Sequence, residues 1–454
     1  MPPRGAAVLS ERNFKRVYQG INVWDATQER LKFIFNEFEK VYVSFSGGKD
    51  SGVLLNLVID YVRANCPDRK VGVQVMDNEA NYKLSTRFML DMLDNNRDIL
   101  DIYWCCLPIT IGCSVSVYHS DWQAWGNDYR DRWIQEQPDR DYVVNWENRL
   151  EKGFDWFKEN SWYDHFWDDF AEWYSDGVPT ANLIGIRTQE SLNRFRAIMN
   201  EGKTTHKGKM WTKKNTDWVY NCYPIFDWKT DDIWTATAKN EWDYNKLYDM
   251  FYKAGVPVNS MRVASPFMSE AKSSLNMYRV IDPEIWTRLV ARVNGANFVA
   301  TYGKQLDYKS VKLPKGHTWK SFVKFLLKTL PDETAENFRQ RFVQALRFWA
   351  RTGRGLYPET IQELRENGVK FYLNGKTAHG SKMLDRVRII NPPDHVDFLS
   401  KNNGMVHSWK RFAITILKND HTCKYMGLAP TKEQAARQRE IMSKYKCVED
   451  VYKK

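Results

Sequence analysis

A chain of 454 residues is too long for one ordinary domain, since domains average about 150 residues. Hydrophobic residues make up 43% of the chain and charged residues 27%, a composition that excludes global disorder. No apolar run reaches about 18 residues, and residues 1–11 lack an apolar stretch, so we expect neither a membrane span nor a secretion signal. The seven cysteines form no Cys-x-x-Cys pair, which indicates reduced thiols in a cytoplasmic protein, without disulfides or a zinc site.

Charge is distributed unevenly along the chain. Residues 301–454 contain 30 lysines and arginines against 15 acids, a net charge of +15, whereas residues 1–300 have a net charge of −4. Within the first part, residues 121–174 alone contain 14 acids against 6 basic residues. Such asymmetry favours a C-terminal third that faces a polyanion such as nucleic acid. The alternative is a basic surface that only keeps the protein soluble.

Strands alternate with helices in the first half of the chain. The hydrophobic pattern predicts a helical lead-in over 11–40 and then strands over 41–45, 71–76, 99–107 and 181–186. A helix is predicted directly after the first strand, from apolar positions between 53 and 62, and another over 82–93. This alternation is typical of an α/β protein with a doubly wound parallel sheet, whose ligands bind beyond the carboxyl ends of the strands.

Residues 110–179, between the third and fourth predicted strands, form a segment too long for a loop. The segment contains eight tryptophans among many acids, whereas disordered acidic segments are poor in aromatic residues. We therefore expect a Trp-rich helical insertion, and the functional alternative is an aromatic platform for a base or a partner. Beyond residue 255 the pattern is mainly helical, with helices expected over 285–293, 319–329, 335–350, 360–367 and 432–445 and a short strand over 369–373.

The strongest local signal is the segment Ser44-Phe-Ser-Gly-Gly-Lys-Asp-Ser-Gly52, which lies between a predicted strand and a predicted helix. Its glycines allow backbone N–H groups to surround an anion, and the helix N-terminus that follows adds partial positive charge. Lys49 adds a full positive charge, and Asp50 implies a cation such as Mg²⁺ beside the anion. The segment is not a Walker A loop, because Val43 stands where that motif needs its first glycine. The alternative is an ordinary glycine-rich turn.

This segment resembles the pyrophosphate loop of the adenine-nucleotide alpha-hydrolase-like superfamily, which includes the ATP pyrophosphatases and the phosphoadenosine-phosphosulfate (PAPS) reductases. Residues 185–194 (Gly-Ile-Arg-Thr-Gln-Glu-Ser-Leu-Asn-Arg) resemble the Gly-x-Arg-x-x-Glu-Ser-x-x-Arg segment of the PAPS reductase branch. Residues 223–234 resemble its Pro-x-x-x-Trp-x-x-x-Asp-Val-Trp segment. The C-terminal part, around 408–427, resembles the extension of the IbrA-like subgroup, which is linked with PAPS reductase or sulfurtransferase activity and with ParB-like partners.

The resemblance covers about 35–255 and implies a nucleotide-binding α/β domain over 41–255, with a helical lead-in at 1–40 and a basic, mainly helical domain at 256–454. It implies an enzyme that binds ATP, or a PAPS- or APS-like nucleotide, with Mg²⁺. Such an enzyme adenylates an acceptor and releases pyrophosphate, in this family also for sulfur transfer. Lys49, Asp50 and Arg187 are the expected catalytic residues, with Asp50 as the Mg²⁺ ligand. The expected nucleotide contacts are Ser44, Ser46, Gly47, Gly48, Lys49, Asp50, Ser51, Asp77, Asn78, Gly185, Arg187, Glu190 and Arg194.

Physical chemistry supports some of these roles and leaves others open. A guanidinium such as that of Arg187 or Arg194 binds phosphate through paired donors better than a lysine does, although an ion-paired helix start is the alternative. The segment 223–234 is expected to be mainly structural. Asp77 and Asn78 end the second strand, where they either contact the ligand or form a turn.

The cysteines depart from the reductase pattern. The Glu-Cys-Gly-x-His segment of PAPS reductases is absent, and no Cys-x-x-Cys follows the arginine segment, so we expect neither an iron–sulfur cluster nor zinc. Cys105 and Cys106, at the end of the third strand, are the candidate thiols for a reductase, with small buried residues as the alternative reading.

Two functions besides adenylation stay open. One is a sulfonucleotide reductase with an unusual thiol, and the other is a nucleotide-gated regulatory subunit that binds DNA with a ParB-like partner. For nucleic acid, the candidate contacts in the basic third are Trp409, Lys410, Arg411, Lys418 and Lys424, which interleave with aromatic residues. In the competing interpretation those aromatic residues form a core under a solvated basic surface.

Overall fold

The computed structural model describes residues 20–116, 119–200, 202–268, 275–293, 296, 313–379, 382–400, 406–421, 423 and 426. The chain divides into two compact units, and each is described by itself. The first unit comprises Met1–Gln74, Met92–Asp101 and Tyr174–Tyr244. The second comprises Val75–Asp91, Ile102–Trp173 and Asn245–Lys454. The boundaries predicted at 40/41 and 255/256 stay predictions.

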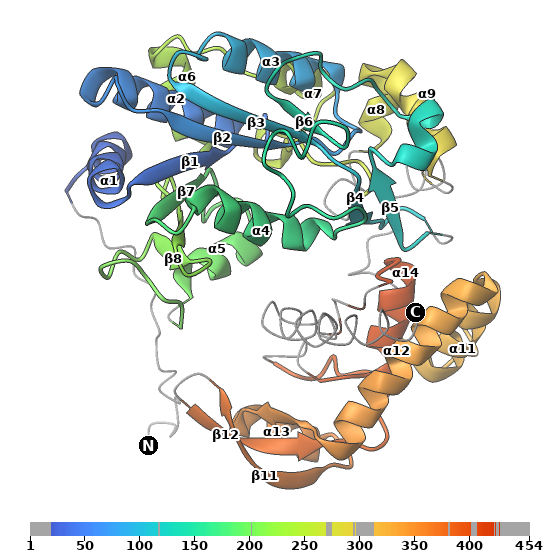
Figure 1. Ribbon diagram of the computed structural model, residues 1–454. Coiled ribbons are helices and arrows are strands. Elements are labelled where there is room, and N and C mark those ends of the chain that lie inside the picture. Colours follow the sequence, from blue (N-terminus) through green and yellow to red (C-terminus); the bar gives the residue numbers. More distant parts are fainter. Residues whose placement is uncertain are drawn as a thin grey trace, which may run out of the picture. The chain divides into compact units, whose positions relative to one another are not determined.

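A seven-stranded sheet of order β6-β3-β2-β1-β7-β9-β8 is the centre of the α/β fold (Figure 1). Strands β1, β2, β7 and β9 pair in parallel, as do β3 and β6, and β8 pairs antiparallel with its neighbour β9. This arrangement confirms the predicted α/β class with a mainly parallel sheet, and all four predicted strands are present. The strands are β1 (Lys40–Ser44), β2 (Val71–Met76), β3 (Leu100–Cys106), β6 (Val143–Asn145), β7 (Thr180–Ile184), β8 (Thr212–Lys214) and β9 (Val219–Cys222).

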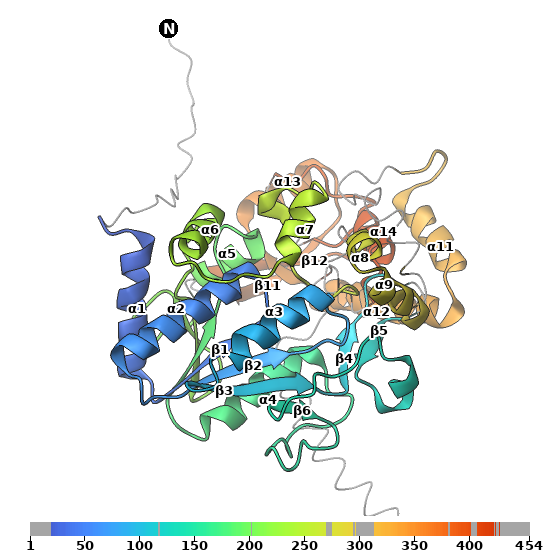
Figure 2. The same cartoon turned by 90° about the horizontal axis from the view of Figure 1, so that it is seen from above.

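In the first unit, long helices cover the sheet because their apolar stripes need burial. Helix α2 (Lys49–Asn65) lies side by side with α6 (Thr230–Lys239) on one face of the sheet (Figures 1 and 2) and also contacts α1 (Val23–Glu37). Helix α1 begins at Asn22, whose side chain caps it, and buries Leu31 and Ile34. It confirms the predicted lead-in helix, whose residues 11–19 lie outside the described residues. The short helix α5 (Leu192–Met199) follows β7.

The segments 44–52, 185–194 and 223–234 are called the first, second and third motifs. The third motif holds α1 in place. Arg30 forms two hydrogen bonds with the Asp227 carboxylate, of 2.8 and 2.6 Å, and the indole N–H of Trp228 donates to Thr27 Oγ1 at 2.9 Å. Trp228 is buried and its ring packs against that of Trp24. These contacts agree with the expectation that the segment 223–234 is mainly structural.

In the second unit, the Trp-rich segment differs from the expected helical insertion. It contains a hairpin of β4 (Ile109–Gly112) and β5 (Asp121–Ala124), a short 3₁₀ helix, η1 (Asn127–Arg132), and strand β6, and among its described residues only α4 (Tyr163–Ser175) is an α-helix. Among the tryptophans before α4, only Trp122 and Trp125 are three residues apart and the others are more widely spaced, so they do not form one helical stripe. Instead they pack ring against ring between turns, as Trp125 and Trp133 do at a centroid distance of 5.1 Å.

The C-terminal part of the second unit is mainly helical, as predicted, but it also contains a small antiparallel sheet of order β10-β12-β11. The expected strand over 369–373 begins later and runs longer, because residues 374–376 (Asn-Gly-Lys) conceal its alternation. The predicted helix over 432–445 lies outside the described residues. The elements are α7 (Leu247–Lys253), η2 (Val258–Ser260), α8 (Asn276–Ile281), α9 (Pro283–Arg292), α11 (Trp319–Thr329), α12 (Asp332–Arg351), β10 (Arg354–Leu356), α13 (Pro358–Glu366), β11 (Tyr372–His379), β12 (Lys382–Arg388) and α14 (Trp409–Leu417).

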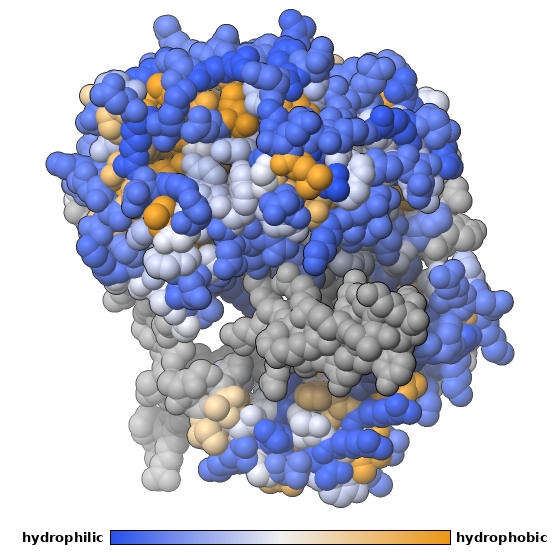
Figure 3. All heavy atoms as spheres, in the orientation of Figure 1, coloured by the Kyte–Doolittle hydropathy of each residue, from blue (hydrophilic) through white to orange (hydrophobic). Residues whose placement is uncertain are grey.

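The surface visible in Figure 3 is mostly hydrophilic, with apolar side chains in scattered patches. Among the helices that the structure describes, none combines the length and the apolar character needed to cross a bilayer.

Helix α3 (Lys83–Asp94) follows β2, close to the predicted range of 82–93.

Candidate functional site

The loop after β1 lies where the ligands of parallel sheets bind. Strand β1 has parallel neighbours on both sides, β2 and β7, and the loop leaves its carboxyl end. Gly47 has a φ of +67°, in the left-handed region that favours glycine, and Gly48 is the N-cap of α2. Since Gly48 has no side chain, the first turn of a buried 17-residue helix is left without a side-chain cap. The loop therefore has the backbone geometry expected of an anion cradle.

Asp50 stands between two cations in the first turn of α2. Its Oδ2 lies 3.0 Å from Lys49 Nζ, and its Oδ1 lies 2.7 Å from Arg187 Nε. All three side chains are buried. Because each carboxylate oxygen already accepts from a cation, Asp50 in this arrangement links Lys49 to the second motif. Across the described part of the chain, no group of three or more His, Cys, Asp or Glu residues could hold a metal ion, so the Mg²⁺ site stays a prediction.

Arg187 connects the three motifs through its guanidinium. Besides Asp50, it donates from Nη1 to Gln189 Oε1 at 3.3 Å and to the Trp228 carbonyl at 3.2 Å, and from Nη2 to Thr230 Oγ1 at 3.5 Å. The side chain is only 2% exposed. This is the ion-paired arrangement that the sequence leaves open as the alternative to phosphate binding. In this arrangement Arg187 positions Asp50, and a direct contact with an anion needs a different side-chain position or the remaining N–H of Nη2.

Glu190 and Arg194 form an ion pair at the start of α5. Glu190 Oε2 accepts the backbone N–H of Arg187 at 3.0 Å and also forms an ion pair with Arg194. Ser191 caps the helix, since its Oγ accepts the backbone N–H of Arg194 at 3.2 Å. The Glu190 carboxylate is nearly buried, whereas the Arg194 side chain is 40% exposed. Of the two arginines in the second motif, Arg194 is thus the one that a ligand reaches without rearrangement.

A glycine brings the second motif against the loop. A Cβ atom at Gly185 would lie 2.9 Å from both the backbone N and the Cα of Ser51, closer than real Cβ atoms come to backbone. The residue therefore has to be glycine for the end of β7 to approach the N-terminus of α2. Within the loop, the hydroxyls of Ser46 and Ser51 lie 3.1 Å apart and share a hydrogen bond.

A row of polar side chains crosses the sheet beside the loop, and the sequence analysis missed most of it. Ser44 Oγ donates to Asn182 Oδ1 at 2.8 Å, and Asn182 Nδ2 donates to Asn221 Oδ1 at 2.9 Å. Gln74, which pairs with Ser44 in the parallel register, is 1% exposed, and neither Nε2 nor Oε1 has a partner among the described residues. A buried amide without partners is costly, so Gln74 offers a donor and an acceptor to a ligand. The sequence contains one signal for this residue, because the polar Gln74 interrupts the apolar run Val71–Met76 of a predicted buried strand.

In the second unit, the acids at the end of β2 are tied to the Trp-rich segment. Asp77 Oδ2 accepts from the indole of Trp104 at 2.9 Å, and burial raises the pKa of Asp77 to about 6. Glu79 accepts the backbone N–H groups of Trp125 at 2.7 Å and Ile134 at 2.9 Å, and burial raises its pKa to about 7. Both carboxyls therefore serve internal hydrogen bonds. Asn78 differs, because its Oδ1 is buried and has no partner among the described residues.

The two candidate thiols are inaccessible. Cys105 and Cys106 are both 0% exposed, and neither forms a disulfide. Burial, and to a smaller extent the charge of Asp77, raises the pKa of Cys106 well above that of a free thiol. A reactive cysteine needs exposure and a lowered pKa, so this pair has the properties of a structural one.

The candidate nucleic-acid contacts are engaged within the second unit. Trp409 packs on Phe412 in a core between α11, α12 and α14, and Lys410 Nζ lies 2.6 Å from the Asp397 carboxylate. Lys418 is half-buried, and burial lowers its pKa. Arg411 lies in the first turn of α14, where its backbone N–H donates to the capping Ser408. Lys424 lies outside the described residues. The arrangement favours the interpretation in which these aromatic residues form a core.

Structural similarity to solved proteins is weak. A PAPS reductase from Candida auris, in a phosphate complex, is 14% identical, with 55% of this chain and 96% of that chain covered and a TM-score of 0.28. The FMN adenylyltransferase of Candida glabrata, in complex with FMN and an ATP analogue, is 16% identical, with 52% and 64% covered and a TM-score of 0.28. The U34-tRNA thiolase NcsA of Methanococcus maripaludis is 12% identical, with 65% and 82% covered and a TM-score of 0.27.

Sequence similarity is more informative. Residues 151–254, which include the second and third motifs, match the phosphoadenosine phosphosulfate reductase domain, and residues 255–437 match a domain of unknown function, DUF3440. The Uncharacterized protein YbdN of Escherichia coli (strain K12) is 30% identical over 423 residues, which cover 91% of this chain and 92% of YbdN. The chain therefore belongs to the same family as YbdN, and it carries a PAPS reductase domain followed by a DUF3440 domain.

Proposed function

We propose that the protein binds ATP, or a closely related adenine nucleotide, at the loop 44–51 and transfers its adenylyl group to an acceptor. The observation that carries this proposal is the loop itself. A glycine pair at the start of buried helix α2 follows the carboxyl end of a central parallel strand, with Lys49 in the first turn and the second motif packed against it at Gly185. The match of residues 151–254 to the PAPS reductase domain also supports a nucleotide substrate.

Each part of the site has a role in the proposed reaction. The loop N–H groups, the dipole of α2 and the Lys49 ammonium hold the phosphates and stabilise the charge that develops on them. The acceptor forms a bond to the α-phosphorus, the bond from that phosphorus to its bridging oxygen breaks, and pyrophosphate leaves with the electron pair. Arg187 keeps Asp50 beside Lys49, and Gln74 hydrogen-bonds the ligand. Mg²⁺ would arrive with the phosphates, because the Asp50 oxygens, each bonded to a cation, do not fit the role of its ligand.

The alternatives receive less support from the geometry. A thiol-dependent reductase needs an accessible thiolate, and Cys105 and Cys106 are buried. Sulfur transfer, as in part of the PAPS reductase family, remains compatible with adenylation, because an adenylated acceptor is the activated form that a sulfur nucleophile attacks.

Substitution of Lys49 tests the proposal. Lys49→Ala should weaken ATP binding by about 1.5–3 kcal/mol, the contribution of one charge-assisted hydrogen bond. Isothermal titration of the folded variant measures this, and Lys239→Ala, which removes an exposed lysine from the end of α6, is the matched control. ATP affinity equal in Lys49→Ala and the control would rule out nucleotide binding at this loop. Binding without any ATP–pyrophosphate exchange, across candidate acceptors, would favour the regulatory alternative over adenylation.

A further inference from the structure

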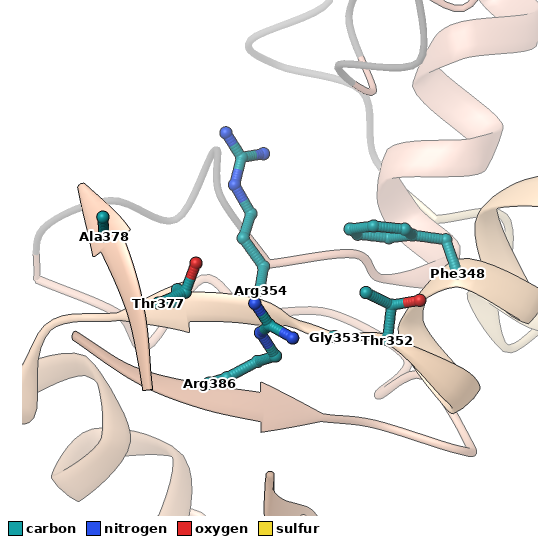
Figure 4. Close-up of a pocket in the computed structure, with 8 residues that line it drawn as sticks. Phe348, Thr352, Gly353, Arg354, Thr377, Ala378 and Arg386 are labelled. Carbon is teal, nitrogen blue, oxygen red and sulfur yellow. The ribbon is translucent and has the colours of Figure 1, made fainter. Parts of the chain in front are cut away.

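The second unit contains a cavity in the part of the chain that matches DUF3440. A cavity of about 290 Å³ lies between the C-terminal end of α12 and the small sheet of β10, β12 and β11 (Figure 4). Its lining includes Phe348, Thr352, Gly353, Arg354, Thr377 and Arg386. The volume is close to the lower end of the range of about 300–1,000 Å³ that is typical of small-molecule sites. None of the residues expected from the sequence to bind a ligand lies in it.

The cavity is cationic and its two arginines are available. Arg354 comes from β10 and Arg386 from β12, and both side chains reach toward the cavity (Figure 4). Within the described part of the chain, neither guanidinium forms a hydrogen bond or an ion pair. Asp385 precedes Arg386 on β12 and is not among the residues that line the cavity.

Glycines make room for a ligand between the arginines. Gly355 stands opposite Arg386 in the β10–β12 register, and a Cβ atom there would lie 2.5 Å from Thr377 Cγ2. Gly353 has a φ of +72°, and a Cβ atom there would lie 2.2 Å from the Val387 carbonyl oxygen. Both positions therefore require glycine, which lets the strands pack closely and leaves the space beside Arg386 free of side chains.

An aromatic ring and two hydroxyls complete the chemistry. Phe348 is 41% exposed and its ring stands at one wall of the cavity, with Thr352 below it and Thr377 on the opposite side (Figure 4). Paired guanidinium groups bind phosphate oxygens, and an exposed ring next to them stacks on a nucleobase. Stacking of this kind requires a base that is not paired in a duplex. The excess of positive charge over residues 301–454 attracts the phosphates of a polymer more strongly than those of one nucleotide.

We propose that this cavity binds one nucleotide unit of a single-stranded nucleic acid, with its phosphate held by Arg354 and Arg386 and its base stacked on Phe348. The site is built entirely from residues 348–386, so it does not depend on the proposed adenine-nucleotide site. Failure of one proposal leaves the other unaffected, because the oligonucleotide is titrated in the absence of ATP.

The test uses the full-length protein and a fluorescent oligothymidine of about 16 nucleotides, the upper end of common site sizes. Fluorescence anisotropy is measured from about 50 to 200 mM salt for the wild type, Arg354→Ala, Arg386→Ala, the double variant and Phe348→Ala. Each single arginine substitution should weaken binding about 10- to 100-fold, and the double variant should lower the log–log salt slope by about 0.7 for each phosphate that the protein no longer neutralises. The control is Arg339→Ala, which removes an exposed arginine from the same helix, α12, away from the cavity.

Three outcomes overturn the proposal. One is no binding of the oligonucleotide by the wild type at the lowest salt concentration. Another is an equal loss of affinity in Arg339→Ala and Arg386→Ala, which would indicate attraction by net charge alone. The last is tight binding of AMP or inorganic phosphate at Arg354 and Arg386 without oligonucleotide binding, which would assign the cavity to a small anion. Thermal unfolding of each variant verifies that it is folded, and Arg386→Lys, which keeps the charge without the planar guanidinium, should recover only part of the affinity.

Discussion

Arg187 and Asp50 form a buried ion pair, with Nε 2.7 Å from Oδ1, that joins the second motif to the first turn of α2. The two residues are 137 positions apart in the sequence and follow the carboxyl ends of neighbouring parallel strands, β7 and β1. Arg187 also contacts the third motif through the Trp228 carbonyl. The three motifs that the sequence places far apart are therefore held together by one guanidinium. Because Lys49 and Arg187 share one carboxylate, the three side chains together keep a net positive charge.

Loss of this guanidinium should destabilise the protein. Arg187→Ala leaves Asp50 buried with only Lys49 as a partner, and breaking a buried pair in this way costs about 3–5 kcal/mol. Arg187→Lys should recover part of that loss, since it keeps the charge but cannot reach Gln189, Trp228 and Thr230 together. Urea unfolding of the three proteins measures the free energy of unfolding. A loss below about 1 kcal/mol in Arg187→Ala would contradict the central role of this ion pair.

Substitution of Gln74 should affect the free energy of unfolding in the opposite sense to substitution of Arg187. Gln74→Met keeps the size of the side chain but removes two buried polar atoms that lack partners. The free energy of unfolding should therefore stay the same or rise by about 1–3 kcal/mol, while ATP binding weakens because the ligand loses its hydrogen bonds. Unfolding and ATP titration of the same variant check both effects. Lower stability with unchanged ATP affinity would indicate that Gln74 is satisfied within the protein and does not contact the nucleotide.

The sequence predicts the parts of the fold that follow from local pattern. Strand β1 is a short apolar run that ends in a glycine-rich segment, and this pattern alone indicates a strand, a loop and a helix. The Trp-rich segment could not be predicted in the same way, because its tryptophans satisfy burial by packing on one another and on phenylalanine rings across turns. Of the small sheet, only part of β11 was predicted, since its strands carry polar residues on exposed positions and β10 pairs with β12 across the intervening helix α13.

For the candidate site too, the sequence predicts which residues take part but does not predict their contacts. Motif spacing identifies Lys49, Asp50 and Arg187, but it cannot show that Asp50 and Arg187 bond to each other, because that depends on the register of β1 and β7. Gly185 is part of a motif, yet its physical reason, the close approach to Ser51, appears only in three dimensions. The arginines of the cavity beside β10 and β12 belong to no motif, so their proximity follows only from the pairing of these two strands.

The buried acids at the end of β2 should give stability an unusual pH dependence. Asp77 has an ordinary pKa of 3.8 that burial raises to about 6, and Glu79 has one of 4.5 that burial raises to about 7. As the pH rises through this window, the unfolded chain loses these protons first, so folding is progressively less favoured. Each group lowers the free energy of unfolding by about 1.4 kcal/mol per pH unit between its two pKa values, and its contribution is constant above the folded pKa.

Asp77→Asn isolates this effect from that of the other carboxyl groups. As the pH rises from about 4 to about 6, the wild type should lose stability relative to Asp77→Asn. Above about pH 6 the difference between the two proteins should be constant. The wild type should likewise lose stability relative to Glu79→Gln up to about pH 7. Urea unfolding at a series of pH values measures both differences. A difference that does not change with pH would mean that these carboxyls are already ionised in the folded protein.

Thiol reactivity distinguishes the reductase alternative from the proposed function. Because Cys105 and Cys106 are fully buried and the pKa of Cys106 is raised, neither should react with a thiol reagent such as DTNB in the folded protein. Cys66 is only partly buried and should react faster than this pair, although burial also raises its pKa. The matched control is the double variant Cys105→Ser/Cys106→Ser, whose native protein should be labelled to the same extent as the wild type. Labelling of the wild type that exceeds the control before denaturant is added would expose a reactive thiol beside β3, and a sulfonucleotide reductase would then become the better explanation of the site.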